Sequence, residues 1–216
     1  MRRFDLVIFD CDGVLIDSEP IANAVFSRQL ATVGIRMTPD EVMRAFVGRS
    51  RDTCIAMAGE MRGEKLPEDF AARWDKALHE ALDREVKPVD GIPELLRSLP
   101  MPYCVASNGE PTHMERGLTA AGLLPLVVGR LFSASEVAHP KPAPDVYLHA
   151  AKTMGAAPDR CAVIEDTATG VRAGVAAGMA VFGYVAGPQS DAATLRALGA
   201  TPFERMRDLR ALLTTA

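Results

Sequence analysis

The sequence lacks the features that mark several large classes of protein. Its four cysteines are far apart and form no C-x-x-C pair, so we expect neither a disulfide framework nor a zinc site. No apolar run reaches the ~18 residues that a membrane-spanning helix needs, so we expect no membrane partner. The N-terminal segment has no h-region and no small-residue cleavage site, which favours a cytoplasmic protein without a secretory signal.

The chain also lacks the excess of basic residues that is typical of nucleic-acid-binding proteins. It has 24 Lys and Arg residues against 28 Asp and Glu residues, which gives a formal net charge of −4. Proteins that bind nucleic acids normally present a basic stripe, so we expect no nucleic-acid partner. The 48% of hydrophobic residues is typical of an ordinary globular protein. No apolar stripe is left over for a subunit interface, so we expect a monomer.

What the sequence does contain is an alternation of strands and helices. Residues 4–9 form a short apolar run, which is typical of a buried parallel strand. Four more strands are expected, at 103–107, 129–133, 161–165 and 180–185. Helices that end near a glycine are expected between them, at 112–121, 144–154 and 168–177. The pattern predicts an α/β fold with a doubly wound, Rossmann-like parallel sheet.

A helical segment interrupts this pattern after the first strand. Residues 16–87 contain no convincing strand, and Ser18 is expected to cap the first of four helices. The second helix has an explicit start signal, since Thr38-Pro39-Asp40-Glu41 is a capping box with proline at the first helical position. We therefore expect a core domain of residues 1–15 plus 88–216, with residues 16–87 inserted as a small all-helical cap domain.

Four short segments with chemically active side chains follow the expected strand ends. The first, Asp10-Cys11-Asp12-Gly13-Val14, places two carboxylates two residues apart, which suits a metal-assisted nucleophile with a proton carrier. Acid-rich strand ends also occur as plain turns. Ionised carboxylates beside a buried strand need a metal or a cationic partner, and this favours the functional interpretation.

The second and third segments could bind phosphate. The hydroxyl, amide and flexible glycine of Ser107-Asn108-Gly109 can hydrogen-bond a phosphate, although a plain strand-to-helix turn is the simpler interpretation. In His139–Asp145, prolines flank Lys141 and are expected to hold it in a stiff, extended loop. There its charge can neutralise a phosphoryl group, and a solvated loop lysine is the equal alternative.

The fourth segment ends the 161–165 strand with two acids. Glu165 and Asp166 resemble the hard oxygen ligands that Mg²⁺ prefers. A helix N-cap would explain Asp166 but would explain Glu165 less well. Because all four segments are expected at one edge of one sheet, together they indicate a phosphate- and metal-binding site.

These segments, in this order, resemble the four motifs of the haloacid dehalogenase-like superfamily. The Asp-x-Asp-Gly-Val and Lys-Pro-Ala-Pro-Asp forms, with the helical insert, are similar to its β-phosphoglucomutase-like phosphatase branch. Residues 102–109 are similar to bacterial 6-phosphogluconate phosphatases. The resemblance covers essentially the whole chain. It implies Mg²⁺-dependent hydrolysis of a small phosphorylated metabolite, a sugar, polyol or sugar-acid phosphate, through an aspartyl-phosphate intermediate.

The resemblance also implies a role for each acidic motif residue. Asp10 would be the nucleophile, and Asp12 would be the general acid and then the general base. The Mg²⁺ cofactor would be held by the Asp10 carboxylate, the Asp12 main-chain carbonyl and Asp166, with Glu165 as a ligand or just behind the ligands.

The phosphate and the rest of the substrate would be bound by other residues. Ser107 and the main chain of Asn108 would bind the phosphoryl oxygens, and Lys141 would offset their charge. The cap would supply specificity, with Gly48 and Arg51 in its substrate-facing loop. Weaker candidates on the first cap helix are Glu19 and Asn23.

Three rival functions were weighed against hydrolysis. A sugar-phosphate mutase uses the same chemistry, but mutases carry a histidine in the first cap helix and a lysine before the cap-loop glycine, whereas residues 19–24 contain no histidine and residue 47 is valine. A haloacid dehalogenase carries tyrosine at the position of Asp12. A non-catalytic phosphate-binding domain would be marked by loss of Asp10 or Asp12, and both are present.

Overall fold

The computed structural model describes residues 3–46, 49, 51–185 and 190–214, and its chain divides into two compact units. The larger unit comprises Met1–Asp17 and Lys87–Ala216, and the smaller unit is Ser18–Val86. None of the described helices is both long enough and apolar enough to cross a membrane. All four cysteines are buried and unpaired, as the absence of C-x-x-C pairs predicts.

The larger unit is built on a parallel sheet. Among the described residues it has six strands in the order β3-β2-β1-β4-β5-β6. The strands are β1 (Leu6–Phe9), β2 (Tyr103–Ser107), β3 (Leu131–Ser133), β4 (Cys161–Glu165), β5 (Ala180–Tyr184) and β6 (Thr201–Phe203). The strand order reverses between β1 and β4, the place where open α/β sheets bind ligands. The doubly wound, Rossmann-like sheet is therefore confirmed.

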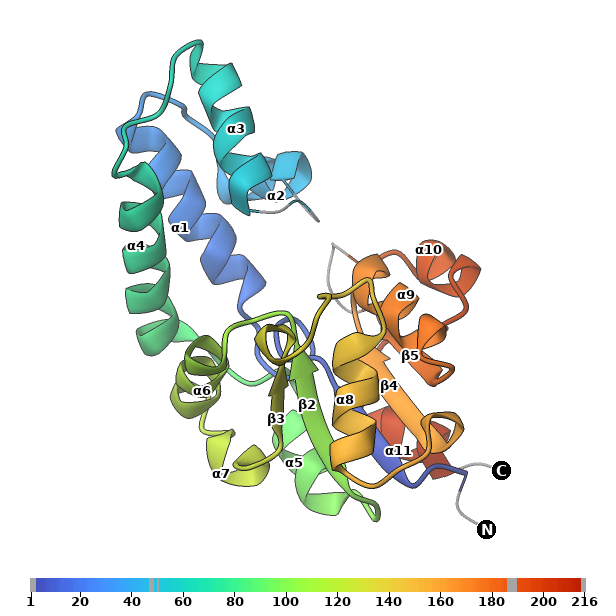
Figure 1. The fold of residues 1–216 in the computed structure, drawn as a ribbon. Coiled ribbons are helices and arrows are strands. Elements are labelled where there is room, and N and C mark those ends of the chain that lie inside the picture. The colour runs from blue at the N-terminus through green and yellow to red at the C-terminus, as the bar shows by residue number, and fades with distance from the viewer. Residues whose placement is uncertain (1–2, 47–48, 50, 186–189, 215–216) are drawn as a thin grey trace. The chain divides into compact units, whose positions relative to one another are not determined.

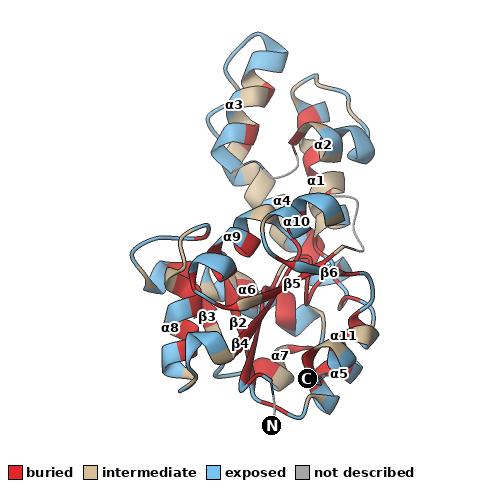
Figure 2. Ribbon diagram, turned by 90° about the vertical axis from the view of Figure 1, so that its right-hand side faces the viewer, coloured by how far each residue is buried: buried red, intermediate tan, exposed pale blue. Residues whose placement is uncertain are grey.

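Helices cover both faces of this sheet. On one face lie α8 (Asp145–Thr153) and α9 (Ala168–Ala176), and on the other lie α5 (Ile92–Ser98) and α11 (Met206–Thr214) (Figures 1 and 2). The other helical segments are α6 (Pro111–Ala120), α7 (Leu124–Val127), η1 (Ala134–Glu136), η2 (Pro158–Arg160) and α10 (Ala192–Ala197).

The strands are buried because both of their faces are covered. Every residue of β1 and β4 is buried, which explains the continuous apolar runs in the sequence (Figure 2). Leu6 and Ile8 pack into a cluster with Val146 and Tyr147 of α8. β3 begins later than expected, at Leu131, because Gly129 has φ +73°, outside the β region.

The smaller unit consists of helices around a core of its own. They are α1 (Glu19–Thr32), α2 (Pro39–Phe46), α3 (Arg51–Arg62) and α4 (Phe70–Glu85). The capping box of α2 is confirmed: the main-chain N–H of Thr38 donates to Glu41 Oε2 at 2.7 Å, and that of Glu41 donates to Thr38 Oγ1 at 3.3 Å. Ser18 stands at the N-cap position of α1 as predicted, but its backbone angles are already helical and its side chain makes no capping bond.

A short antiparallel pair of segments joins the chain where it leaves and re-enters the larger unit. The N–H of Asp17 donates to Lys87 O, and that of Val89 donates to Leu15 O, both at 2.9 Å. Ile16 forms an antiparallel bridge with Pro88 between these two bonds. We call residues 15–17 and 87–89 the stem. The two units divide at 17/18 and 86/87, at the end of this stem.

Candidate active site

The carboxyl ends of adjacent strands carry most of the predicted site residues. Asp10 follows β1, Ser107 is the last residue of β2, and Glu165 ends β4 with Asp166 directly after it. β1 pairs with both β2 and β4, so these strand ends are neighbours in the sheet. All four of these side chains are buried, which places polar groups where the protein must supply their partners.

Lys141 reaches this edge from the loop after β3. Its Nζ donates to Asp10 Oδ1 at 2.5 Å and to Glu165 Oε1 at 2.9 Å. The same Nζ lies 4.6 Å from the centre of the Tyr147 ring, a cation–π contact. The third sequence segment is therefore joined to the first and the fourth in a single buried cluster.

The loop that carries Lys141 is a turn, so its predicted extended form is wrong. The N–H of Ala143 donates to Pro140 O at 2.9 Å, and the Lys141–Pro142 bond inside this turn is cis. The Asn108 side chain fixes the turn, because Lys141 N–H donates to its Oδ1 at 2.8 Å and its Nδ2 donates to Lys141 O at 3.2 Å. The side chain of Asn108 thus positions Lys141, which sequence reasoning missed.

Glu165 is hydrogen-bonded on both carboxylate oxygens. Oε1 accepts from Lys141 Nζ and from the Tyr147 hydroxyl, the latter at 3.0 Å. Oε2 accepts from the main-chain N–H groups of Asp166 and Thr167, each at 3.0 Å, and from the Thr167 hydroxyl at 2.9 Å. Five donors fill the roughly four lone-pair sites of the carboxylate, so Glu165 is a rigid support for Lys141 and for the start of α9.

Two glycines make room for the acids. A Cβ on Gly13 would lie 2.2 Å from Asp166 Oδ2, and a Cβ on Gly170 would lie 1.6 Å from Glu165 Oε1. Gly13 also has φ +80°, a conformation that glycine adopts readily and that lets the chain turn after the half-buried Asp12. Any other residue at either position would push a carboxylate out of the cluster.

Burial and neighbouring charges shift the pKa values of the charged residues in this cluster in different directions. Burial raises the pKa of Asp10 to about 7, against the attraction of Lys141. Burial acts in the same direction on Glu165, but the Lys141 charge and the bonds from Lys141 and Thr167 outweigh it and lower the pKa of Glu165. Burial alone would lower the pKa of Lys141, but Asp10 and Glu165 hold it well above its usual value. The protein alone therefore stabilises the charge of Asp10 least.

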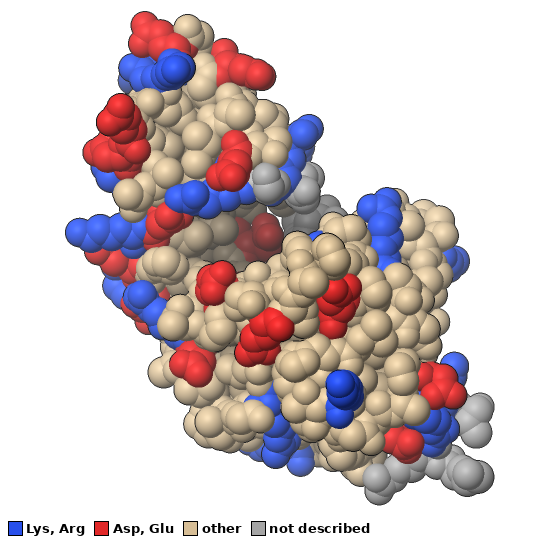
Figure 3. All heavy atoms as spheres, viewed as in Figure 1, with Lys and Arg blue, Asp and Glu red and all other residues tan. Residues whose placement is uncertain are grey.

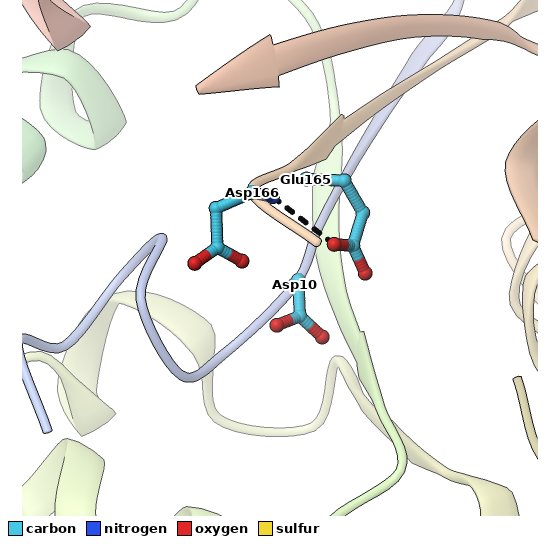
Figure 4. Close-up of side chains that lie close together, drawn as sticks. All are labelled: Asp10, Glu165 and Asp166. Atoms are coloured by element: carbon cyan, nitrogen blue, oxygen red, sulfur yellow. Dashed lines mark hydrogen bonds between the residues drawn. The ribbon is translucent and has the colours of Figure 1, made fainter. Parts of the chain in front are cut away.

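Asp10, Glu165 and Asp166 form a group that can hold a cation. Each offers one carboxylate oxygen, and these oxygens lie within 4.8 Å of one another (Figure 4). Hard oxygen donors are the ligands of Mg²⁺ and Ca²⁺. A cation beside Asp10 would also favour its charged form, which the protein alone stabilises poorly.

The predicted substrate residues of the cap lie in the other unit. Gly48 falls outside the described residues. Arg51 begins α3, and its guanidinium donates to Asp75 of α4, from Nε at 2.8 Å and from Nη2 at 2.5 Å. Asp75 and Tyr147 are partners that sequence reasoning missed. Tyr147 lies among the apolar residues of α8, where an aromatic residue is typical of an ordinary core.

Comparison with known proteins agrees with these motifs. A sequence model of the haloacid dehalogenase-like hydrolases matches residues 4–178. The chain is 31% identical to the 6-phosphogluconate phosphatase of Escherichia coli over 88% of its length and 86% of that protein, and 33% identical to the hexitol phosphatase A of the same organism over 81% and 80%. A Deinococcus radiodurans HAD family hydrolase, solved with bound phosphate and sodium, aligns over 100% of this chain and 99% of its own at 33% identity with a TM-score of 0.87. The chain therefore belongs to the haloacid dehalogenase-like hydrolase family.

Proposed function

We propose that the protein is a Mg²⁺-dependent phosphatase that releases phosphate from a small sugar, polyol or sugar-acid monophosphate through an aspartyl-phosphate on Asp10. The observation that carries this proposal is the buried junction of Asp10 with Lys141, Glu165 and Asp166 beside the switch point of the sheet. The named phosphatases among its relatives support the same reaction.

In the first step, a carboxylate oxygen of Asp10 attacks phosphorus. A bond forms between that oxygen and phosphorus, the ester bond between phosphorus and the substrate oxygen breaks, and Asp12 gives its proton to the leaving oxygen. In the second step Asp12 takes a proton from water, and the water oxygen attacks phosphorus. The bond to Asp10 then breaks, which frees inorganic phosphate and restores both acids.

Lys141 and Ser107 would bind the phosphoryl group during both steps. Lys141 Nζ lies 2.5 Å from the Asp10 oxygen, so a phosphoryl group on Asp10 is within reach of its charge. Ser107 Oγ accepts from the N–H of Gly109 at 3.0 Å and keeps its own proton for a phosphoryl oxygen. The Asn108 side chain holds Lys141 in place, which leaves the Asn108 main-chain N–H for the phosphate.

The cofactor site would use the carboxylates of Asp10 and Asp166 and the main-chain carbonyl of Asp12. The two carboxylates belong to the group of oxygens that lie within 4.8 Å of one another. When bound, Mg²⁺ would offset the repulsion between the Asp10 carboxylate and a phosphate dianion. Glu165 already accepts five hydrogen bonds, so we assign it to support Lys141.

The smaller unit, Ser18–Val86, would act as the cap that selects the substrate. The named relatives act on compounds that differ in charge, since one is a phosphatase of a sugar-acid phosphate and another of hexitol phosphates. Sequence identity to the two is similar, so it does not decide between the two substrate classes. We further propose that the protein is a cytoplasmic monomer without nucleic-acid or membrane partners. Light scattering of the purified protein would test its oligomeric state.

The test of the reaction is phosphate release from an aryl phosphate and from a panel of phosphorylated sugars, polyols and sugar acids. We expect release in the presence of Mg²⁺, and loss of release when a chelator removes the metal. Absence of release from every compound with Mg²⁺ present would overturn the proposal. Conversion of glucose 1-phosphate to glucose 6-phosphate with little free phosphate would favour the mutase instead.

A further inference from the structure

A pocket of about 260 Å³ lies within the smaller unit, lined by residues of α1, α2, α3 and α4. Its apolar lining includes Phe26, Phe46 and Trp74. The Phe26 and Trp74 rings stack with their centroids 4.0 Å apart and 12° between their planes. Stacked aromatic rings have few rotamers, so the pocket has a rigid apolar floor that suits the C–H face of a carbon chain.

Among the described residues, the polar lining of this pocket has no net charge. It comprises Asn23, two acids and two bases, the charged residues being Glu19, Asp75, Arg49 and Arg51. The formal charges of the two acids and the two bases cancel. Over the face of this unit seen in Figure 3, acidic and basic side chains are likewise interspersed. Neither the lining of the pocket nor this surface supplies a positive field that would draw a ligand carboxylate into the pocket.

Asp75 occupies one of the two edges by which the Arg51 guanidinium can bind a carboxylate. The two hydrogen bonds between them, Nε to Oδ1 at 2.8 Å and Nη2 to Oδ2 at 2.5 Å, form the parallel pair by which arginine binds carboxylates. A ligand carboxylate would either have to displace Asp75 or bind the other edge of Arg51, next to Asp75 and to Asp52, which lies 3.8 Å from Nη1, and in both cases it would meet a negative charge at close range. A hydroxyl group has no charge to be repelled, and it can accept from Asn23 or donate to an acid.

We propose that this pocket accepts an uncharged polyhydroxy chain and that Asp75, held against Arg51, disfavours a ligand carboxylate by its negative charge. The inference rests on the phosphatase function proposed above and deepens it: the substrate class is a neutral sugar or polyol monophosphate, not a sugar-acid phosphate. Asp75 is then a residue that determines specificity, and Arg51 positions it.

A matched pair of substrates tests this directly. Glucitol 6-phosphate and 6-phosphogluconate share one carbon skeleton and differ at the terminal carbon, which is CH₂OH in the first and a carboxylate in the second. We expect the wild-type protein to have a kcat/KM at least about tenfold higher for glucitol 6-phosphate, because the cost of one close like-charge contact at a half-exposed site lies between its small value in bulk water and its larger value near a protein surface. A preference for 6-phosphogluconate would overturn the inference.

Two variants separate the role of Asp75 from general effects of charge. Asp75→Asn keeps the shape of the side chain and removes the competing charge, so we expect it to move the ratio of kcat/KM about tenfold toward 6-phosphogluconate. Asp52→Asn is the matched control, because Asp52 is an exposed acid 3.8 Å from the Arg51 Nη1 and does not line the pocket. We expect this control to leave the ratio unchanged.

The outcomes distinguish this inference from the proposed function. An unchanged ratio in Asp75→Asn, with wild-type protein active on an aryl phosphate, would overturn the role of Asp75 and leave the phosphatase standing. An equal shift in both variants would show an effect of surface charge only and would also overturn it. Absence of any aryl phosphate hydrolysis by the wild type with Mg²⁺ would overturn the proposed function instead. In the double variant Arg51→Ala/Asp75→Asn we expect no gain for 6-phosphogluconate, and a retained gain would contradict the part assigned to Arg51.

Discussion

Each of the two units contains a basic side chain that is paired with carboxylates, but the pair is buried in the larger unit and exposed in the smaller one. In the larger unit the side chains of Lys141, Asp10 and Glu165 are 4%, 12% and 1% exposed, whereas those of Arg51 and Asp75 in the smaller unit are 45% and 42% exposed. Breaking a buried pair from one side costs about 3–5 kcal/mol, and an exposed pair contributes about 0–1 kcal/mol. The first arrangement suits chemistry at a fixed geometry, and the second suits selection among ligands.

The largest effect is expected from Asp10→Asn. The amide cannot form the aspartyl-phosphate, so kcat should fall by about four orders of magnitude or more, the scale on which loss of a nucleophile acts. The measurement is phosphate release from the best substrate, with circular dichroism to confirm the fold. Activity near that of the wild type would show that Asp10 is not the nucleophile. The buried ion pair of the larger unit could then no longer be contrasted, as the site of the reaction, with the exposed pair of the smaller unit.

Lys141→Met tests the buried member of the comparison. The change leaves Glu165 and Asp10 together in the interior without their cation, so the free energy of unfolding should fall by about 3–5 kcal/mol. Urea unfolding measures this. The control is Lys152→Met, an exposed position near the end of α8, which should change stability little. A loss of less than about 1 kcal/mol in Lys141→Met would make the two ion pairs energetically alike.

Asp12→Asn should reduce kcat by about 10²-fold or more, because the amide cannot exchange a proton with the leaving oxygen or with water. Its Mg²⁺ affinity, measured by titration calorimetry, should stay close to that of the wild type, since the main-chain carbonyl is the proposed ligand. A weaker affinity with intact turnover would show that Asp12 acts on the metal and not on the proton.

Tyr147→Phe removes one hydrogen bond to Glu165 but keeps the ring beneath Lys141. A hydrogen bond to a charged group contributes about 1.5–3 kcal/mol, and this is the expected loss of stability. The matched control is Tyr103→Phe, whose hydroxyl donates to the uncharged Leu126 carbonyl at 3.1 Å and should cost about 0.5–1.5 kcal/mol. Equal losses would mean that the charge of Glu165 adds nothing to the bond.

The smallest effect on stability is expected from Arg51→Ala. An exposed ion pair contributes little even with two hydrogen bonds, so the free energy of unfolding should fall by about 1 kcal/mol or less. Chemical unfolding measured beside Lys141→Met gives the comparison in a single experiment. A loss as large as that of Lys141→Met would show that the Arg51–Asp75 pair holds α3 against α4, which is a structural role.

The sequence was sufficient to predict a strand or a helix end where one physical reason dominates the choice of residue. A short continuous apolar run is typical of a covered strand and predicts β1 and β4, and glycine after a helix marks the ends of α8 and α9. β6 was missed because it is a three-residue strand with a proline in the middle. Short helices such as α5 and α7 each hold two turns or fewer, which leaves too few residues to show a helical period.

The same limit explains what was missed in the candidate site. Asp10 and Asp166 could be identified because charged residues beside buried strands need a chemical reason, and Lys141 because prolines flank it on both sides. Tyr147 could not, because its ring fits an apolar helix face and only the fold brings its hydroxyl to Glu165. The pairing of Arg51 with Asp75 joins residues 24 positions apart on different helices, and no local pattern reports such a contact.

The stem has a consequence for how this protein can diversify. Residues 15–17 and 87–89 are hydrogen-bonded to each other, so the chain leaves the sheet unit and returns to it at adjacent points. The entropy of closing an excursion between two adjacent points grows only slowly with its length. The excursion can therefore be lengthened, shortened or exchanged without disturbing the register of the sheet. The stem therefore allows residues 18–86 to be replaced by another segment while the sheet unit keeps its sequence.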